Sequence, residues 1–177
     1  MRTFIAIETS EELREKMAEL QKQLAIEGVK PVEKENLHLT LHFLGEIDEV
    51  MKDKVIKGMD KLNCKKFEMS CEVVGAFPSK NYIRVIWVGA EAPELKQIYD
   101  QLGTEFARLG FKQEQFSPHI TLARVKFLKD KEKLTEFLEE NEQVELGDCK
   151  VDGVFLKKST LTPKGPIYEN VYEKKLL

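Results

Sequence analysis

A four-residue pattern, His-x-Thr-Leu, occurs twice in this chain, as HLTL at residues 38–41 and as HITL at residues 119–122. The chain holds only three histidines, and two of them begin a copy of the pattern. Each copy lies in an apolar run typical of a strand, in which residues i and i+2 point to the same face. Each copy therefore presents one imidazole beside one hydroxyl, with an apolar side chain on the opposite face.

The order of predicted elements also repeats along the chain. His38 lies 34 residues after Phe4, and His119 lies 36 residues after Ile83. This spacing predicts an internal duplication whose pseudo-two-fold axis brings the two motif strands together, within a single domain that spans residues 1–177. The predicted series is strand 4–7, helix 11–24, motif strand 37–44, helix 49–59 and strand 67–76, and then strand 82–88, helix 93–109, motif strand 119–125, helix 130–141 and strand material at 144–156 and 171–176.

Composition is that of a soluble globular protein, with 42% hydrophobic and 33% charged residues. The net charge of −3 argues against a wholesale coat of nucleic acid but permits a local basic groove. No run of about 18 apolar residues and no signal-peptide pattern is present, so we expect a cytoplasmic protein without a membrane contact. Cys64, Cys71 and Cys149 form no C-x-x-C pair, which predicts reduced, buried thiols. The absence of a heptad pattern favours a monomer.

Two imidazoles and two hydroxyls around one small anion can perform acid–base chemistry near neutral pH. A zinc site would need three or four ligands, and no H-E-x-x-H, C-x-x-C, G-x-S-x-G or phosphate-binding glycine loop occurs, so we expect neither metal nor cofactor. In-line displacement at a phosphodiester fits these groups. One histidine takes a proton from water, the other protonates the leaving oxygen, and the threonines donate to the nonbridging oxygens.

Four further positions have two interpretations each. His42 would share the face of the first His-Thr pair by strand alternation, as a substrate contact or a peripheral structural group. Arg124 ends the second motif strand, either as a phosphate contact or in a surface ion pair, although alternation directs it away from the second His-Thr pair. Arg84 interrupts an apolar strand, either at a sheet edge or in a cleft. The basic segment 157–160 belongs to a solvated face or to an RNA groove.

Three segments carry a resemblance to a known family: HLTLHFLG at 38–45, HITLARV at 119–125 and FLKKSTLTPKGPIYE at 155–169. They resemble the 2H phosphoesterase superfamily and, within it, the LigT-type RNA 2′,3′-cyclic phosphodiesterases, formerly called 2′-5′ RNA ligases. The resemblance extends from FIAIE near the start to Tyr168. It implies an α+β, bilobal duplicated fold, in which two antiparallel β-sheets line a central cleft and the helices lie outside.

The resemblance also implies a reaction and its residues. His38 and His119 match the catalytic histidines, and Thr40 and Thr121 match the phosphate-binding threonines. The implied reaction is hydrolysis of a terminal 2′,3′-cyclic phosphate, on RNA ends or small nucleotides, to a 2′-phosphomonoester, with 2′-5′ ligation as its reverse. We assign His38 as the proton donor and His119 as the proton acceptor.

Two other functions stay open. One is a phosphodiesterase for other cyclic or 2′-5′ linked nucleotides. The other is a non-catalytic RNA-binding module, against which the intact pair of motifs argues, because a binder does not need both imidazoles.

Overall fold

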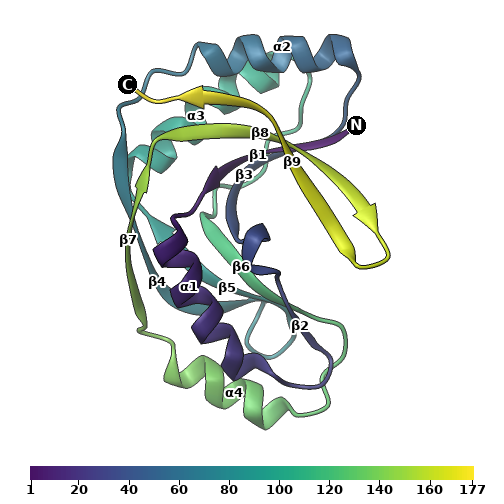
Figure 1. The fold of residues 1–177 in the computed structure, drawn as a ribbon, viewed down its shortest axis with the longest axis vertical. Coiled ribbons are helices and arrows are strands. Elements are labelled where there is room, and N and C mark those ends of the chain that lie inside the picture. Colours follow the sequence, from purple (N-terminus) through teal and green to yellow (C-terminus); the bar gives the residue numbers. More distant parts are fainter.

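One continuous antiparallel sheet forms the centre of the protein, in a computed structural model that describes residues 1–177. The strand order is β7-β4-β5-β6-β3-β1-β8-β9, and β2 pairs with β6 off this path (Figure 1). The strands are β1 (Arg2–Glu8), β2 (Val29–Pro31), β3 (His38–Glu46), β4 (Phe67–Pro78), β5 (Ile83–Glu91), β6 (His119–Val125), β7 (Glu145–Val151), β8 (Gly153–Thr162) and β9 (Gly165–Lys175).

This order is symmetric about the junction of β3 and β6. On one side of the junction follow β1, β8 and β9, and on the other side follow β5, β4 and β7. Each motif strand therefore pairs with the strand that begins its own half of the chain. The arrangement is the one that the repeated element order predicts, with the two motif strands adjacent at the centre.

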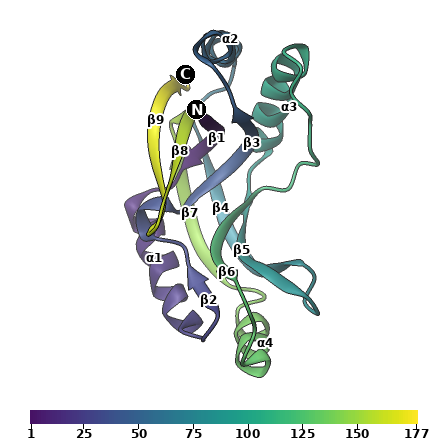
Figure 2. The same cartoon turned by 90° about the vertical axis from the view of Figure 1, so that its right-hand side faces the viewer.

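Four α-helices and two short 3-10 turns accompany the sheet, which confirms the predicted α+β class with helices outside. Figures 1 and 2 show α2 and α3 together at one end of the molecule and α1 and α4 at the other. The two expected sheets are joined into one, because Leu39 of β3 pairs with Ile120 of β6. The helical elements are α1 (Glu11–Gln21), η1 (Lys22–Leu24), η2 (Lys34–Asn36), α2 (Glu49–Asp60), α3 (Pro93–Arg108) and α4 (Lys131–Glu140).

Local sequence explains where the helices begin. The Ser10 hydroxyl accepts a hydrogen bond from the Leu13 amide at 3.2 Å, and the Asp48 carboxylate accepts one from the Met51 amide at 2.8 Å. These side chains satisfy amides that the first helical turn leaves free. In α3, Pro93 stands in the first turn, where its missing amide proton costs no hydrogen bond.

The apolar core lies between the helices and one face of the sheet. Ile5, Leu39 and Ile120 from the strands and Leu95 and Phe106 from α3 are all fully buried in it. The opposite face of the sheet is therefore available for polar side chains. No helix is long and apolar enough to span a lipid bilayer.

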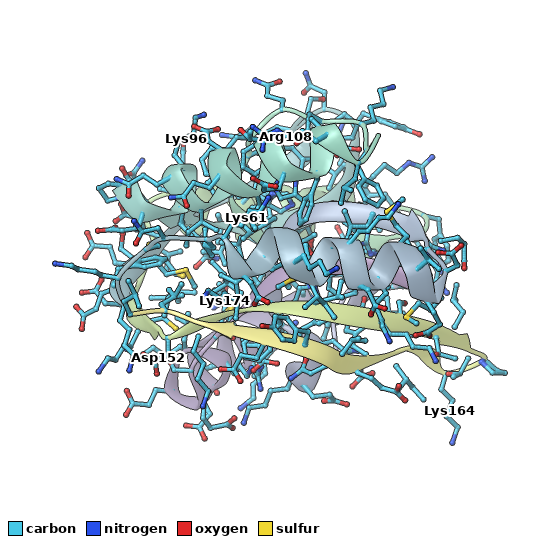
Figure 3. The ribbon with its side chains drawn as sticks, turned by 90° about the horizontal axis from the view of Figure 1, so that it is seen from above. Lys61, Lys96, Arg108, Asp152, Lys164 and Lys174 are labelled. Atoms are coloured by element: carbon cyan, nitrogen blue, oxygen red, sulfur yellow. The ribbon has the colours of Figure 1, made fainter.

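The C-terminal hairpin is longer than the sequence predicts. β8 and β9 run as a continuous antiparallel pair from Gly153 and Lys175 to the turn at Thr162 and Gly165. The predicted strand material ends at residue 156 and begins again only at residue 171, because the polar stretch between them lacks apolar alternation. Figure 3 shows Lys164 at the tip of this hairpin, pointing away from the body of the protein.

Candidate active site

The sheet register brings the two motifs side by side. Leu39 and Ile120 are antiparallel partners, and both are fully buried. Their neighbours along each strand therefore point to the other face of the sheet. We call this the motif face, because it carries both His-Thr pairs.

On the motif face the register sets each histidine opposite a threonine. His38 stands across from Thr121, and Thr40 stands across from His119, so the two histidines lie on a diagonal. Directly opposed Cβ atoms in antiparallel strands lie about 4.5–5.5 Å apart, and diagonal partners about 7–8 Å apart. Spacings of this order let both imidazoles reach one small group, with a hydroxyl on either side. All four side chains are half-buried.

Both motif strands contain a β-bulge at the same place. The register between β1 and β3 shifts at Leu41, and the register between β5 and β6 shifts at Leu122. Each of these leucines is the last residue of its motif. Because a bulge adds one residue to one strand, alternation is reversed beyond it. The next residue turns toward the core, and the one after it turns to the motif face.

This bulge corrects the prediction for His42. The side chain points into the core rather than sharing the face of His38, and it is only 7% exposed. Its ring stacks on Tyr99 with centroids 4.3 Å apart and meets the Phe106 ring edge-on at 5.3 Å. Nε2 donates to the Tyr99 carbonyl oxygen at 3.1 Å. Burial lowers the pKa of His42, and the side chain packs as part of the core.

The same bulge corrects the predicted direction of Arg124. Phe43 and Arg124 occupy equivalent positions two residues after the bulged leucine, and both are exposed. The positive charge of Arg124 reaches Tyr168, whose pKa burial raises and this charge lowers. Tyr168 in turn meets the His38 ring edge-on, with centroids 5.2 Å apart. Arg124 therefore borders the motif face at the end where His38 lies.

Arg84 is placed elsewhere. Its guanidinium donates to the Tyr82 hydroxyl through Nε at 2.8 Å and lies over the Tyr82 ring at 4.8 Å from the centroid. Both residues are exposed near the turn between β4 and β5. The structure therefore gives Arg84 a partner at the end of β5, an interior strand of the sheet, beside the turn that joins β4 and β5.

His38 lies in an aromatic enclosure. Its ring stacks on Phe4 at 5.1 Å and meets Tyr168 edge-on, while Nε2 lies 3.1 Å from the Thr40 hydroxyl. Burial and, to a smaller degree, the charge of Lys157 lower the pKa of His38 to about 4, against the opposing effect of a hydrogen bond to the Asn36 backbone. The imidazole is therefore uncharged at neutral pH while the site is empty.

The His119 ring is oriented by the backbone that precedes β6. The Ser117 carbonyl lies 2.6 Å from Nδ1, and because a carbonyl oxygen only accepts, the proton of the uncharged ring is on Nδ1. Nε2 is then left with a free lone pair, as a general base requires. Phe77 meets the ring edge-on at 5.0 Å, and Trp87 lies beyond it at 6.3 Å.

A groove of about 330 Å³ opens beside His119. Three of its walls are the aromatic rings of Phe43, Phe77 and Phe116, and Phe43 is 66% exposed. The two ends of the motif face therefore differ. Arg124 lies at the end where His38 lies, and the aromatic groove lies beside His119. The other lining residues are Thr40, Leu41, Tyr99, Glu114, Gln115, Ser117 and Pro118.

Sequence reasoning missed three residues near His38. Lys157 is 7% exposed and contacts both Glu8 and Asn170, although the basic segment 157–160 was expected on a solvated face or in an RNA groove. One signal was available, because Phe4, Ala6 and Glu8 alternate along β1, which places Glu8 on the face of its cross-strand partner His38. No group of three or more His, Cys, Asp or Glu side chains is placed to hold a metal ion.

Comparison with known proteins identifies the family. The sequence model described as LigT like Phosphoesterase matches residues 6–87 and, a second time, residues 88–168. The two matches divide the chain as the element order does. A duplicated antiparallel sheet with paired His-x-Thr motifs at its centre defines a class of phosphoesterase. Within that class, the chain belongs to the LigT like phosphoesterase family.

Relatives and solved structures agree with this assignment. An RNA 2′,3′-cyclic phosphodiesterase of Methanocaldococcus jannaschii is 44% identical over 98% of this chain and 99% of its own length. One from Thermotoga maritima is 38% identical over 98% of this chain and 94% of its own. A crystal structure of a Thermus thermophilus protein aligns with a TM-score of 0.88 at 30% identity, covering 99% and 98% of the two chains. Escherichia coli LigT complexed with 3′-AMP aligns with a TM-score of 0.82 at 26% identity, covering 99% and 97%.

Proposed function

We propose that this protein is an RNA 2′,3′-cyclic phosphodiesterase that works by acid–base catalysis with two histidines and yields a 2′-phosphomonoester. The observation that carries the proposal is the register of Leu39 with Ile120, because it lets two imidazoles and two hydroxyls reach one small group. The names of the relatives support the choice of substrate.

The reaction assigns one step to each side chain. His119 Nε2 takes a proton from water as the water oxygen attacks phosphorus. The bond from phosphorus to the 3′ oxygen breaks, and His38 gives that oxygen a proton. Thr40 and Thr121 donate hydrogen bonds to the nonbridging oxygens, on which negative charge increases in the transition state.

His38 can act as the acid only after it has gained a proton. In the empty site the pKa of His38 is about 4, so His38 must take up its proton when the substrate binds. The phosphate of that substrate is an anion. A negative charge beside an imidazole favours the charged form and raises its pKa. The bound phosphate therefore favours the protonated form of His38, which is the form that donates the proton.

Binding of the RNA strand uses the end of the motif face where Arg124 lies. Arg124 pairs across the strands with Lys30 of β2, so two cations stand side by side on neighbouring strands. Backbone phosphates upstream of the terminal nucleotide are the natural ligands of such a pair. Arg124 is in this proposal a substrate contact, whereas His42 and Arg84 are not.

A second candidate function is favoured by the groove beside His119. A nucleobase stacks well on exposed aromatic rings such as Phe43, and the groove lies on the side from which water attacks. A nucleoside held there could present its 5′-hydroxyl in place of water, which would form a 2′-5′ linkage, or allow cleavage of one in reverse. Other cyclic nucleotides would use the same four motif side chains.

A substrate panel tests these functions. The wild-type protein is incubated with EDTA and without ATP on a dinucleotide ending in 2′,3′-cyclic phosphate, on 3′,5′-cyclic nucleotides and on 2′-5′ linked oligonucleotides. We expect turnover of the first, with a 2′-phosphate product identified by phosphorus NMR, and turnover slower by roughly 10²–10⁴-fold in His119→Ala. Turnover of only the other substrates would favour the second candidate. Binding without any turnover would make the protein an RNA-binding module.

For the cell, we propose a cytoplasmic monomer. Cys64, Cys71 and Cys149 are all free and buried thiols, as expected of a protein in a reducing compartment. Light scattering coupled to size-exclusion chromatography tests the oligomeric state, and a mass of twice the chain's 20.5 kDa would contradict it.

A further inference from the structure

Lys157 is a buried cation on the motif face. Its ammonium donates to Glu8 Oε1 at 2.7 Å and to Asn170 Oδ1 at 2.7 Å, while the Asn170 amide donates to the same Glu8 oxygen at 3.1 Å. The Phe155 ring lies 5.5 Å from the ammonium. Taking the lysine ammonium out of water is costly even when it is paired with a partly exposed carboxylate such as Glu8. The buried ammonium is therefore weak evidence for a role in stability, and its position on the motif face becomes the relevant feature.

The ion pair is fixed beside His38 by the register of three strands. Glu8 is the direct cross-strand partner of His38, and Lys157 is the direct cross-strand partner of Phe4. Phe4 is the residue whose ring stacks on the His38 imidazole. Glu8 and Lys157 thus occupy the motif face on two sides of the ring stack, one strand and two strands away from the histidine.

The other half of the molecule lacks this ion pair. Gly89 is the direct partner of His119, as Glu8 is of His38. Phe77, paired with Val85, takes the place that corresponds to Lys157 and contacts the His119 ring. The duplicated sheet therefore supplies equivalent positions, and only the His38 half fills them with charges.

We propose that Lys157, held by Glu8 and Asn170, is a positioning residue that adds to burial in keeping His38 uncharged in the empty site, so that His38 gains its proton only together with the phosphate. The positive charge opposes a second positive charge on the nearby imidazole, and Glu8 limits the strength of that opposition. An anion bound between the histidines cancels it. The inference rests on the proposed function for its catalytic meaning, but its electrostatic content can be tested without turnover.

The other charged and titratable groups that face His38 act more weakly or from farther away. Arg14 of α1, which donates to Thr9 at 3.2 Å, adds to the effect of Lys157. Tyr168 of β9 contacts the ring and is uncharged at neutral pH, since burial raises its pKa. Arg2 and Arg124 lower the pKa of Tyr168 itself. Lys157 and Glu8 are thus the pair whose opposite signs can be tested separately.

The test removes each charge in turn. Lys157→Met should raise the pKa of His38 and Glu8→Gln should lower it, each by about one unit, which is a tenfold change in proton affinity. Lys157→Arg keeps the charge and should restore the wild-type value. Lys158→Met is the matched control, because this neighbour on β8 points to the opposite face and should leave His38 unchanged.

Two measurements read the result. NMR titration of the histidine ring protons follows His38 in the empty protein and in sulfate. The alkaline limb of kcat against pH follows it with saturating cyclic-phosphate substrate, and should move up in Lys157→Met and down in Glu8→Gln. Shifts of opposite sign by NMR support the inference even if no substrate is turned over. Turnover with no shift, or with shifts of the same sign in both variants, would overturn it while leaving the phosphodiesterase function intact.

Discussion

His38 should be uncharged in the empty enzyme and should take up a proton when an anion binds between the motifs. An exposed imidazole has a pKa of about 6.5. Burial, with the charges of Lys157 and Arg14 acting in the same direction, lowers the pKa of His38 to about 4. At neutral pH the empty site therefore lacks the proton that an acid must supply.

The charge of the ligand is large enough to reverse this. A unit negative charge about 4 Å from the imidazolium contributes about 4 kcal/mol at an effective dielectric constant of about 20. This equals about 3 pH units. Starting from a pKa of about 4, the bound anion brings His38 to about 7 by this arithmetic. Binding and proton uptake should therefore be coupled, by nearly one proton per site at about pH 5.5.

Inorganic sulfate is the probe, because it does not itself titrate in this range. NMR titration of the ring protons, with His38→Ala to assign the signal, gives the pKa with and without sulfate. Calorimetry in two buffers of different ionisation enthalpy counts the protons taken up on binding. His119→Ala should bind sulfate with the same proton uptake. A pKa near 6.5 for His38 in the empty protein, the ordinary value of an exposed imidazole, or sulfate binding without proton uptake, would refute the reasoning.

Three further predictions concern the motif, the core and stability. His38→Ala and His119→Ala should each lower kcat by roughly 10²–10⁴-fold, and Thr121→Ala by roughly 10–10³-fold; a near-wild-type kcat in a folded histidine variant would contradict the mechanism. His42→Ala should cost about 2 kcal/mol in the free energy of unfolding and leave kcat and KM nearly unchanged, as measured by urea denaturation and initial rates; a large rise in KM at wild-type stability would restore His42 as a substrate contact. The folded pKa of His38 lies below its unfolded value, so the unfolded chain binds the proton more readily. The free energy of unfolding should therefore fall by about 3 kcal/mol as pH drops from about 6.5 to about 4. His38→Gln should flatten this pH dependence in thermal melts, and an unchanged curve would argue against a depressed pKa.

The sequence predicted what the two halves share, and it failed where a bulge intervenes. The motif, its strand period and the repeated order of elements suffice to place four side chains on one face at the centre of the sheet. Strict alternation then misplaced His42 and Arg124, which lie beyond the bulges at Leu41 and Leu122. A bulge is a property of the pairing between two strands, and the sequence of one strand does not reveal which residue is left unpaired.

Contacts between segments that are far apart in the sequence could not be predicted either. Lys157 meets Glu8 across 149 positions of sequence, and a lysine in a basic stretch is expected at the surface until the neighbouring strand is known. Similarly, the sequence left Arg84 at a sheet edge or in a cleft, whereas the structure places it near the end of an interior strand, where it donates to the Tyr82 hydroxyl. These placements depend on the tertiary structure, which local periodicity does not encode.

The chemistry depends on the departures from symmetry more than on the symmetry itself. Two identical imidazoles in identical surroundings would hold protons equally well, so their surroundings would not assign the acid role to one and the base role to the other. The shared register and the shared bulge place the two His-Thr pairs on one face, and they are the same in both halves. The surroundings are not the same, because His38 has an ion pair where His119 has a glycine and an aromatic ring. The duplicated backbone thus supplies two equivalent histidines, and a few side chains on neighbouring strands give them different surroundings and so different roles.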